Sequence, residues 1–227
     1  MISGGGRTLM NLLSHCRAGQ LRAEIALVIA SRDTAGVERA RAHNLNVEVI
    51  PGRIPAAKLE SLLKQHAIDW VVLAGYLNLV DIPASYRGKV VNIHPALLPK
   101  FGGKGMFGHH VHEAVIAAGE RESGCTVHLA DEEYDRGRII LQRSCPVYPD
   151  DTPDTLAQRV FELELEAYPT ALKLLLENPE SCPGSLSCSC HCCSPPRCGR
   201  RRCPSSTARP RQRRSRARAR SRTTTSA

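Results

Sequence analysis

Short apolar runs alternate with stretches of helical periodicity through the first 178 residues of this chain. The runs are rich in Val, Ile and Leu, as buried strands are, and they cover residues 24–30, 47–50, 70–74 and 90–93. Between them, residues 34–44 and 55–66 repeat apolar side chains at the spacing of a helix face. This alternation predicts an α/β fold, a doubly wound and mostly parallel sheet with helices on both faces. Ligands bind such a sheet at the carboxyl ends of its strands.

The pattern changes after residue 110. A helix is expected near residues 111–118, followed by strands over 125–130 and 138–147 with a hairpin-like segment between them. An amphipathic helix over residues 153–177 then closes the domain. We therefore expect a single folded domain at residues 1–180, long enough to bury a sizeable core.

Residues 181–227 differ in composition from the rest of the chain. Ser, Cys, Pro, Arg and Thr dominate there, and apolar periodicity disappears. Twelve arginines lie between residues 197 and 222 without any Asp or Glu, so removing them from the net charge of +9 leaves −3 for the remainder. Because such a segment cannot bury enough surface to offset its ordering entropy, we predict that residues 181–227 are disordered.

Both ends depart from what a complete α/β domain would show. Only Met1 and Ile2 precede the glycine-rich turn that begins at Ser3, so the predicted first strand is truncated. Together with the unusual tail, this leads to a hypothesis of a start codon placed too late and a change of reading frame near residue 180. Sequencing the locus tests it, since in-frame apolar codons upstream support the first half and an immediate stop refutes it.

The cysteine distribution favours a reducing compartment. Cys16, Cys125 and Cys145 are dispersed through the first 180 residues, whereas the other seven crowd between residues 182 and 203. Dispersed cysteines fit a reducing cytosol better than a disulfide scaffold. The sequence has no run of 18 apolar residues and no charged-then-apolar leader. These features predict a cytoplasmic protein without a membrane partner, and they leave the oligomeric state open.

The segment Asn92-Ile93-His94-Pro95 lies at the end of a predicted strand and carries reactive side chains. Because side chains alternate along a strand, Asn92 and His94 point to the same side. Asp135 follows 41 positions after His94, in an Asp-Arg-Gly sequence. An amide, an imidazole and a carboxylate are the groups needed to stabilise an oxyanion and move a proton during acyl transfer. A lone strand-end histidine is more often structural, but this setting favours a catalytic trio.

Two other clusters point to ligands. The glycine-rich turn at residues 4–8 opens a helix, where backbone N–H groups and the helix dipole favour a phosphate, although a tight turn alone explains it equally well. His109, His110 and His112 invite a metal, but no carboxylate shares their helix face at the next turn. We therefore expect no metal and assign His109 and His110 to substrate contact. In the tail, the paired cysteines stand too close together for a zinc knuckle.

On these residues the chain resembles the folate-dependent phosphoribosylglycinamide formyltransferase family. The resemblance covers residues 1–178 and none of the tail. The string Asn-x-His-Pro-x-Leu-Leu-Pro with a later Asp-x-Gly is highly specific to folate formyltransferases and their relatives. Further matching stretches are Ser3-Gly4-Gly5-Gly6-Arg7-Thr8-Leu9, Val71-Val72-Leu73-Ala74-Gly75-Tyr76-Leu77, Gly124-Cys125-Thr126-Val127-His128, Ile140-Leu141-Gln142 and Ala167-Tyr168-Pro169.

The resemblance implies an enzyme of purine synthesis that transfers a formyl group from the co-substrate 10-formyltetrahydrofolate to the amine of glycinamide ribonucleotide. It assigns the ribonucleotide phosphate to Gly6, Arg7 and Thr8, with Glu164 on the amine side, although Arg7 and Thr8 depart from the residues usual in the family. Asp135 is expected to orient His94 and favour its protonated form. The folate pocket would be lined by Leu77, Asn78, Leu79, Val80, Asn92, Asp131, Glu132, Glu133, Tyr134 and Asp135.

Three other interpretations remain open. A formyltetrahydrofolate deformylase hydrolyses the same donor, but that family usually carries an N-terminal regulatory domain and lacks this glycine-rich turn. A formyltransferase acting on initiator tRNA would need a large C-terminal RNA-binding domain. The third is an inactive truncated homologue whose arginine-rich tail binds RNA through phosphate charge, without aromatic residues for base stacking.

Overall fold

The computed structural model describes residues 1–177, in which strands and helices alternate as the sequence predicts. The tail prediction, residues 181–227, lies outside the described residues. In chain order the elements are α1 (Arg7–Arg17), β1 (Val28–Ala30), α2 (Ala35–Ala42), β2 (Val47–Val49), α3 (Ala56–Gln65), β3 (Val71–Leu73), the 3-10 helix η1 (Ala84–Tyr86), β4 (Val90–His94), α4 (His109–Ala117), β5 (Glu122–Leu129), β6 (Ile139–Pro146) and α5 (Pro153–Glu177).

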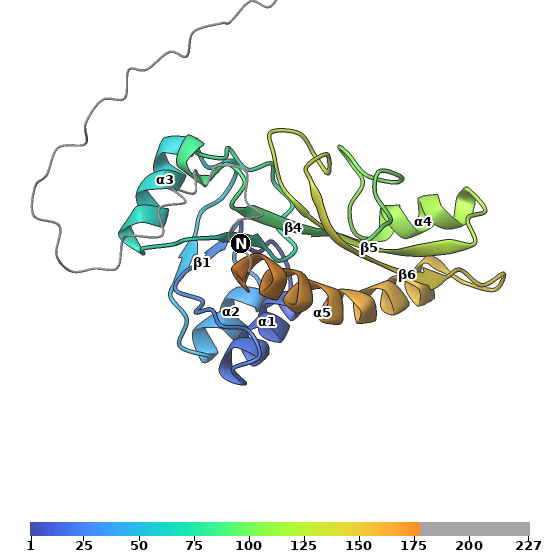
Figure 1. The fold of residues 1–227 in the computed structure, drawn as a ribbon, viewed down its shortest axis with the longest axis horizontal. Helices are drawn as coiled ribbons and strands as arrows, with labels where there is room; N and C mark the ends of the chain where they lie inside the picture. Colours follow the sequence, from blue (N-terminus) through green and yellow to red (C-terminus); the bar gives the residue numbers. More distant parts are fainter. Residues whose placement is uncertain (178–227) are drawn as a thin grey trace, which may run out of the picture. The chain divides into compact units, whose positions relative to one another are not determined.

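The strands form one parallel pair and one four-stranded sheet. β1 and β2 are parallel, and β3, β4, β5 and β6 lie in that order in the larger sheet (Figure 1). β3 and β4 are parallel, whereas β5 runs antiparallel to both of its neighbours. The predicted α/β class is therefore confirmed, with its parallel part in the N-terminal half and a β5–β6 hairpin completing the sheet.

Residues 1–3 connect the two sets of strands. Ile2 forms a parallel bridge with Ala30, and its N–H donates to the Ile29 carbonyl at 2.9 Å. On the other side, the Ser3 N–H donates to the Gly75 carbonyl at 3.0 Å. This short extended segment thus occupies the position of a central strand between β1 and β3.

Strand β1 is shorter than predicted. Residues 24–27 share the apolar composition of β1, but the ladder begins only at Val28, which pairs with Val47. Backbone N–H and C=O groups hold a strand conformation only where a neighbour accepts and donates hydrogen bonds. Since β2 begins at Val47, residues 24–27 lie beyond the end of their partner, and apolar composition alone does not make them a strand.

The long helix α5 fixes the sheet from one face. It lies along β5 and β6 and contacts α1 (Figure 1). Tyr168 is fully buried, and its hydroxyl lies 3.0 Å from the carbonyl oxygens of both Leu73 and Val91. Leu156 and Val160 are also fully buried, and each such aliphatic side chain contributes about 1.5–3 kcal/mol by leaving water. The carboxyl ends of β3 and β4 are held in place by this packing.

Candidate functional site

Strand β4 presents two polar side chains in an otherwise apolar strand. Asn92 and His94 follow the alternation predicted from the sequence, and they lie opposite His128 and Thr126 of β5. His94 is only 4% exposed, and its Nε2 atom lies 2.8 Å from the Phe101 carbonyl oxygen. A carbonyl can only accept, so Nε2 carries the proton and Nδ1 is bare in the neutral ring. The β4 end therefore offers one free acceptor nitrogen on a buried imidazole.

The loop between β5 and β6 brings Asp135 to this strand end. Asp135 Oδ2 lies 3.5 Å from His94 Nδ1 and accepts a hydrogen bond of 2.9 Å from the Gly103 N–H. Its backbone has φ 58°, a left-handed conformation that Asp tolerates better than most residues. The structure thus brings together Asn92, His94 and Asp135, the three residues that the sequence predicts as a catalytic trio.

His128 is a fourth member of this cluster that the sequence analysis missed as a site residue. It is 1% exposed, and its Nε2 lies 3.2 Å from Asn92 Nδ2 and 3.5 Å from Asp135 Oδ1. Its Nδ1 lies 3.0 Å from the Leu129 carbonyl oxygen, so Nδ1 carries the proton and Nε2 accepts from the Asn92 amide. His128 stands in a stretch that matches the resembled family, but its place in the cluster becomes visible only from the antiparallel register of β5 beside β4.

Burial dominates the charge state of the central histidine. Burial lowers the pKa of His94, the Asp135 carboxylate and the Phe101 carbonyl oppose that change, and His128 adds to the lowering. The net direction is downward, so the resting His94 favours the neutral form. The sequence-based expectation that Asp135 favours imidazolium describes the contribution of that carboxylate correctly, but desolvation outweighs it.

Asp135 itself is held as a carboxylate. Burial alone would raise its pKa, but the close contacts with His128 and His94 and the hydrogen bond from the Gly103 N–H outweigh burial, and the pKa lies below its ordinary value. An ionised Asp135 beside a neutral His94 is an arrangement in which the imidazole gains a proton easily when substrate supplies one.

The glycine-rich turn before α1 has its carbonyl oxygens occupied by side chains. Arg32 Nε donates to the Ser3 carbonyl at 2.9 Å, Thr34 Oγ1 donates to the Gly4 carbonyl at 2.9 Å, and Arg39 Nη1 donates to the Gly5 carbonyl. With the carbonyls fixed in this way, the backbone N–H groups at the α1 N-terminus are left to meet a ligand. An N-terminal turn of this kind, flanked by two guanidinium groups, favours an anion.

Two glycines allow this turn to pack against α2. Gly6 caps α1 with φ 72°, and a Cβ there would lie 2.9 Å from Gly36 Cα. A Cβ at Gly36 would collide with the Gly4 carbonyl oxygen. The close approach of the two backbones therefore requires glycine on both sides.

The predicted substrate residues Arg7 and Glu164 are linked through α5. The Arg7 guanidinium lies 3.9 Å from the centre of the Phe161 ring, a cation–π contact. Glu164, one turn later on α5, is 9% exposed; burial raises its pKa to about 7, and the charge of Arg7 opposes that rise. Thr8, the third predicted phosphate residue, is half-buried in the first turn of α1. Arg7, at the start of α1, therefore contacts α5 through Phe161 and acts electrostatically on Glu164 in the middle of that helix.

Only part of the predicted folate-binding set lines a common cavity. A cavity of about 460 Å³ is bounded by Asp131, Glu132 and Glu133 together with Ile82, Arg87, Gly88, Ala130 and Arg136. Its volume falls in the range of small-molecule sites, about 300–1,000 Å³. Tyr134 is exposed next to it, and Asp135 joins the β4 cluster. The acidic loop of residues 131–135 therefore connects the cavity to the cluster.

The other predicted folate residues lie after β3 and do not line this cavity. Leu77 is 44% exposed, and its N–H donates to Ser3 Oγ at 3.0 Å. Asn78 Nδ2 donates to the Gly52 carbonyl, and Val80 is buried in the core. Leu79, between them, is half-buried. Residues 77–80 thus follow β3 in the chain and contact Ser3, at the start of the glycine-rich turn, through the Leu77 N–H. Their contact with folate stays a prediction.

The three histidines near α4 separate into two environments. His109 and His110 are exposed and lie near Glu113, and His109 Nε2 also lies 3.4 Å from Asp154 on α5. The structure does not place either one in the β4 cluster, so their predicted substrate contact remains a prediction. His112 is 3% exposed, and burial lowers its pKa to about 4, with His109 and His94 adding to the effect. Within residues 1–177, no group of three metal-ligating side chains is positioned around a common point.

The β4 cluster and the glycine-rich turn both lie at carboxyl ends of parallel strands, separated by β3. Fold and site together define an α/β protein with a buried cluster of Asn, His and Asp side chains at the carboxyl end of a parallel strand, where ligands bind in such folds. Residues 1–172 match the Formyl transferase family, and the chain belongs to that family.

Similar proteins agree with this assignment. The chain is 40% identical over 177 residues to a chloroplastic phosphoribosylglycinamide formyltransferase of Arabidopsis thaliana, covering 74% of this chain and 61% of that protein. It is 34% identical to phosphoribosylglycinamide formyltransferase of Haemophilus influenzae, covering 78% of this chain and 85% of that protein. The crystal structure of glycinamide ribonucleotide transformylase 1 from Symbiobacterium toebii superimposes with a TM-score of 0.71 at 34% identity, covering 78% and 85% of the two chains.

The chain spans about three fifths of the length of the plant relatives that it matches. The activity of those whole proteins is therefore carried to this chain only as a proposal. No helix within residues 1–177 is long and apolar enough to cross a membrane. The predicted cytoplasmic location stays a prediction, since two of the similar proteins are described as chloroplastic.

Proposed function

We propose that this chain transfers the formyl group of 10-formyltetrahydrofolate to the primary amine of glycinamide ribonucleotide, a step of purine synthesis. The observation that carries the proposal is the buried cluster of Asn92, His94, His128 and Asp135 at the end of β4. Membership of the Formyl transferase family and the similarity to proteins described as phosphoribosylglycinamide formyltransferases support the substrate pair.

The reaction begins with attack of the substrate amine on the formyl carbon. A carbon–nitrogen bond forms, and the formyl oxygen takes up negative charge in a tetrahedral intermediate. The Asn92 amide supplies a donor to that oxygen, because its 3.4 Å contact with Asp135 Oδ1 is long and easily exchanged for a stronger partner. One preorganised donor of this kind is typically worth about 10² to 10³ in rate.

The proton then moves from the attacking amine to the departing folate nitrogen. Neutral His94 has a bare Nδ1 that accepts the amine proton, and the resulting imidazolium is stabilised by Asp135 at 3.5 Å. The positive ring lies beside the developing oxyanion and lowers its energy as well. When the bond between the formyl carbon and the folate nitrogen breaks, the same proton is passed to that nitrogen, and His94 returns to its neutral form.

The two substrates are assigned to opposite sides of this cluster. The ribonucleotide phosphate fits the N–H groups of the glycine-rich turn, where Arg32 and Arg39 add positive charge near the predicted contacts of Gly6, Arg7 and Thr8. The carboxylates of the loop at residues 131–135 suit the N–H donors of a pterin ring. Both ends of the transfer therefore have a matching set of groups, without any requirement for a metal.

Replacing the central imidazole tests the proposal. We expect His94→Ala to lose nearly all formyl transfer while keeping its circular dichroism spectrum and its affinity for the ribonucleotide. His15→Ala, in the last turn of α1 and outside the cluster, is the matched control and should transfer formyl groups at the full rate. Full activity of the His94 variant would remove this residue from its role and the proposal with it.

A further inference from the structure

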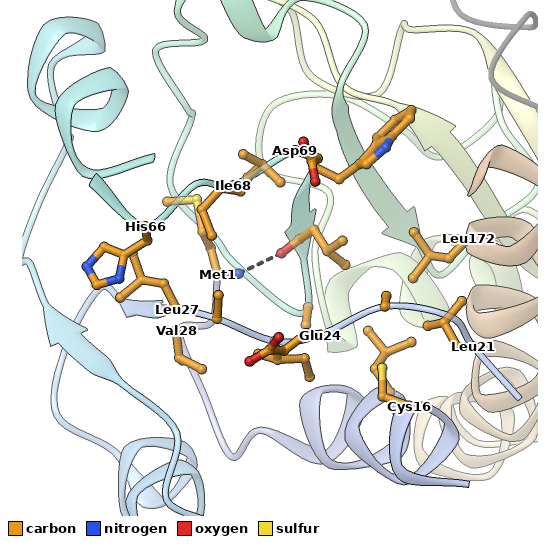
Figure 2. A pocket seen from close by; sticks show the side chains of 18 of the residues that line it. Met1, Cys16, Leu21, Glu24, Leu27, Val28, His66, Ile68, Asp69 and Leu172 are labelled. Atoms are coloured by element: carbon orange, nitrogen blue, oxygen red, sulfur yellow. Dashed lines mark hydrogen bonds between the residues drawn. The ribbon is translucent and has the colours of Figure 1, made fainter. Parts of the chain in front are cut away.

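Helix α1 contacts α5 at successive points along its length. Near the end of α1, Cys16 and Leu172 lie on the same side of a cavity of about 460 Å³ that both helices line (Figure 2). Nearer its start, Asn11 Nδ2 donates to the Leu165 carbonyl at 2.8 Å. The contacts therefore follow both helices in the same direction, and the start of α1 meets α5 about one turn before Leu165.

Arg7 makes that first contact. It is the first residue of α1, and its guanidinium lies 3.9 Å from the centre of the Phe161 ring. Phe161 is half-buried, whereas Arg7 is exposed at the end of the glycine-rich turn. The negative face of an aromatic ring attracts a guanidinium, but it takes up none of the N–H groups in an ordinary hydrogen bond. The ring therefore fixes the place of the positive charge and leaves its donors available for an anion.

The backbone next to Arg7 offers donors of its own. Gly6 is the N-cap of α1, no side chain of the described residues caps the helix by a hydrogen bond, and the first turn carries no acidic residue. The N–H groups of this turn thus keep the partial positive charge of a helix start. Guanidinium and backbone donors together suit a phosphate monoester, because its three terminal oxygens can accept from both at once.

Glu164 provides a second, independent sign of a ligand at this place. It lies three positions after Phe161, on the same face of α5, and only 9% of its surface is exposed. Burial raises its pKa to about 7 and the charge of Arg7 opposes that rise, but no hydrogen bond from residues 1–177 contributes. Buried polar groups are normally hydrogen-bonded. A carboxyl group without such a partner, close enough to feel the charge of Arg7, points to a ligand that brings a donor together with its anion.

We propose that Phe161 is a positioning residue for phosphate recognition, which holds Arg7 beside the α1 N-terminus so that the guanidinium and the backbone N–H groups bind one phosphate monoester. Its identification with the ribonucleotide phosphate rests on the proposed function, whereas the phosphate site itself does not. Without the ring, the long Arg7 side chain would lose rotamer freedom on binding, and that cost would weaken affinity. The ring removes the cost in advance, so Phe161 acts on binding and leaves the transfer step unchanged.

Substitutions at Phe161 separate the effect of the ring from that of its bulk. Phe161→Leu keeps an apolar side chain without an aromatic face, and we expect the KM for glycinamide ribonucleotide to rise about tenfold with kcat within about twofold. Phe161→Tyr keeps the face and should keep the KM. Tyr148→Leu is the matched control, because Tyr148 contacts Arg159 in the same way at 4.4 Å outside the glycine-rich turn. A KM unaffected by Phe161→Leu, or raised equally by Phe161→Tyr, would overturn the proposal.

Binding of inorganic phosphate tests the same contact without formyl transfer. Calorimetric titration should give a Kd about tenfold weaker for Phe161→Leu, and no further weakening when Phe161→Leu is added to Arg7→Ala. Losses that add independently in the double variant would overturn the proposal. If phosphate binds as expected but no formyl group is transferred, the proposed function fails and the role of Phe161 stands. Formyl transfer by Phe161→Leu with an unaltered KM shows the reverse.

A substitution of the cation itself decides the question if Phe161→Leu fails to fold. Arg7→Lys keeps the positive charge, but an ammonium group is not planar and cannot lie against the ring as a guanidinium does. We expect its phosphate affinity to fall severalfold, and an unchanged affinity would overturn the proposal.

Discussion

Replacing Asp135 with Asn removes one charge from the β4 cluster with little change of shape. The substitution keeps a carbonyl oxygen for the Gly103 N–H, and Asn tolerates the left-handed backbone at φ 58°. A pair of unit charges separated by 3.5 Å interacts by about 5 kcal/mol at the effective dielectric of a protein site. Since about 1.4 kcal/mol corresponds to a tenfold change in rate, the upper bound on the loss of formyl-transfer rate is about 10³ to 10⁴. The Asn amide oxygen can still accept a hydrogen bond from the protonated His94 ring, which reduces the expected loss to about 10² to 10³.

The pH profile of the variant carries the more specific result. His94 must be neutral to accept the amine proton, so activity falls as the pH drops through its pKa. The Asp135 carboxylate raises that pKa, and its removal lowers it, so the acidic limb of kcat/KM should move to lower pH in Asp135→Asn. Steady-state formyl transfer measured from pH 5 to 9 checks this, with the exposed Asp150→Asn as control. Unchanged kcat, or an unmoved acidic limb, would refute the assigned role of Asp135.

Three further substitutions probe the glycine-rich turn at residues 4–8, the buried carboxyl group of Glu164 and the packing of α5. Gly36→Ala should raise the KM for the ribonucleotide and lower the melting temperature, because its Cβ collides with the Gly4 carbonyl oxygen and displaces the glycine-rich turn. An unchanged KM would argue against phosphate binding at this turn. Glu164 has a pKa raised by burial to about 7, so its stability contribution is lost as the pH rises from its unfolded pKa towards 7. The free energy of unfolding of Glu164→Gln, relative to that of the unaltered chain, should therefore be higher at pH 8 than at pH 5, by roughly 3 kcal/mol at most. If thermal unfolding shows the same difference between the two proteins at both pH values, the assignment is contradicted. Tyr168→Phe removes a buried hydroxyl and should cost about 1–3 kcal/mol in urea unfolding, whereas Tyr148→Phe, half exposed, should cost little.

The fold was predictable where the periodicity of apolar residues matches the contacts that the segment makes in the folded chain. α5 begins at the predicted residue and continues to Glu177, the last residue that the structure describes, because its apolar stripe is long and regular. Residues 24–27 have the composition of a strand, but they lie beyond the end of β2 and have no partner there. The apolar run therefore predicts a longer β1 than the structure has. Strand ends depend on neighbours that a single segment does not reveal.

The candidate site was predictable in part for the same reason. Asn92 and His94 share a strand, so their common side follows from alternation alone. His128 joins them only through the antiparallel register of β5, which no spacing in the sequence encodes. The neutral state of His94 was also missed, because the amount of burial around an imidazole depends on the packing of the β4 end against Phe101 and Asp135.

Following the formyl carbon itself tests the central claim most directly. The full chain is incubated with 10-formyltetrahydrofolate labelled with ¹³C in the formyl group, with and without glycinamide ribonucleotide, and the label is located by NMR. We predict that the label appears on the ribonucleotide amine in step with tetrahydrofolate release, and only when the ribonucleotide is present. Label appearing as free formate at the same rate in both reactions would identify a hydrolase and contradict the account.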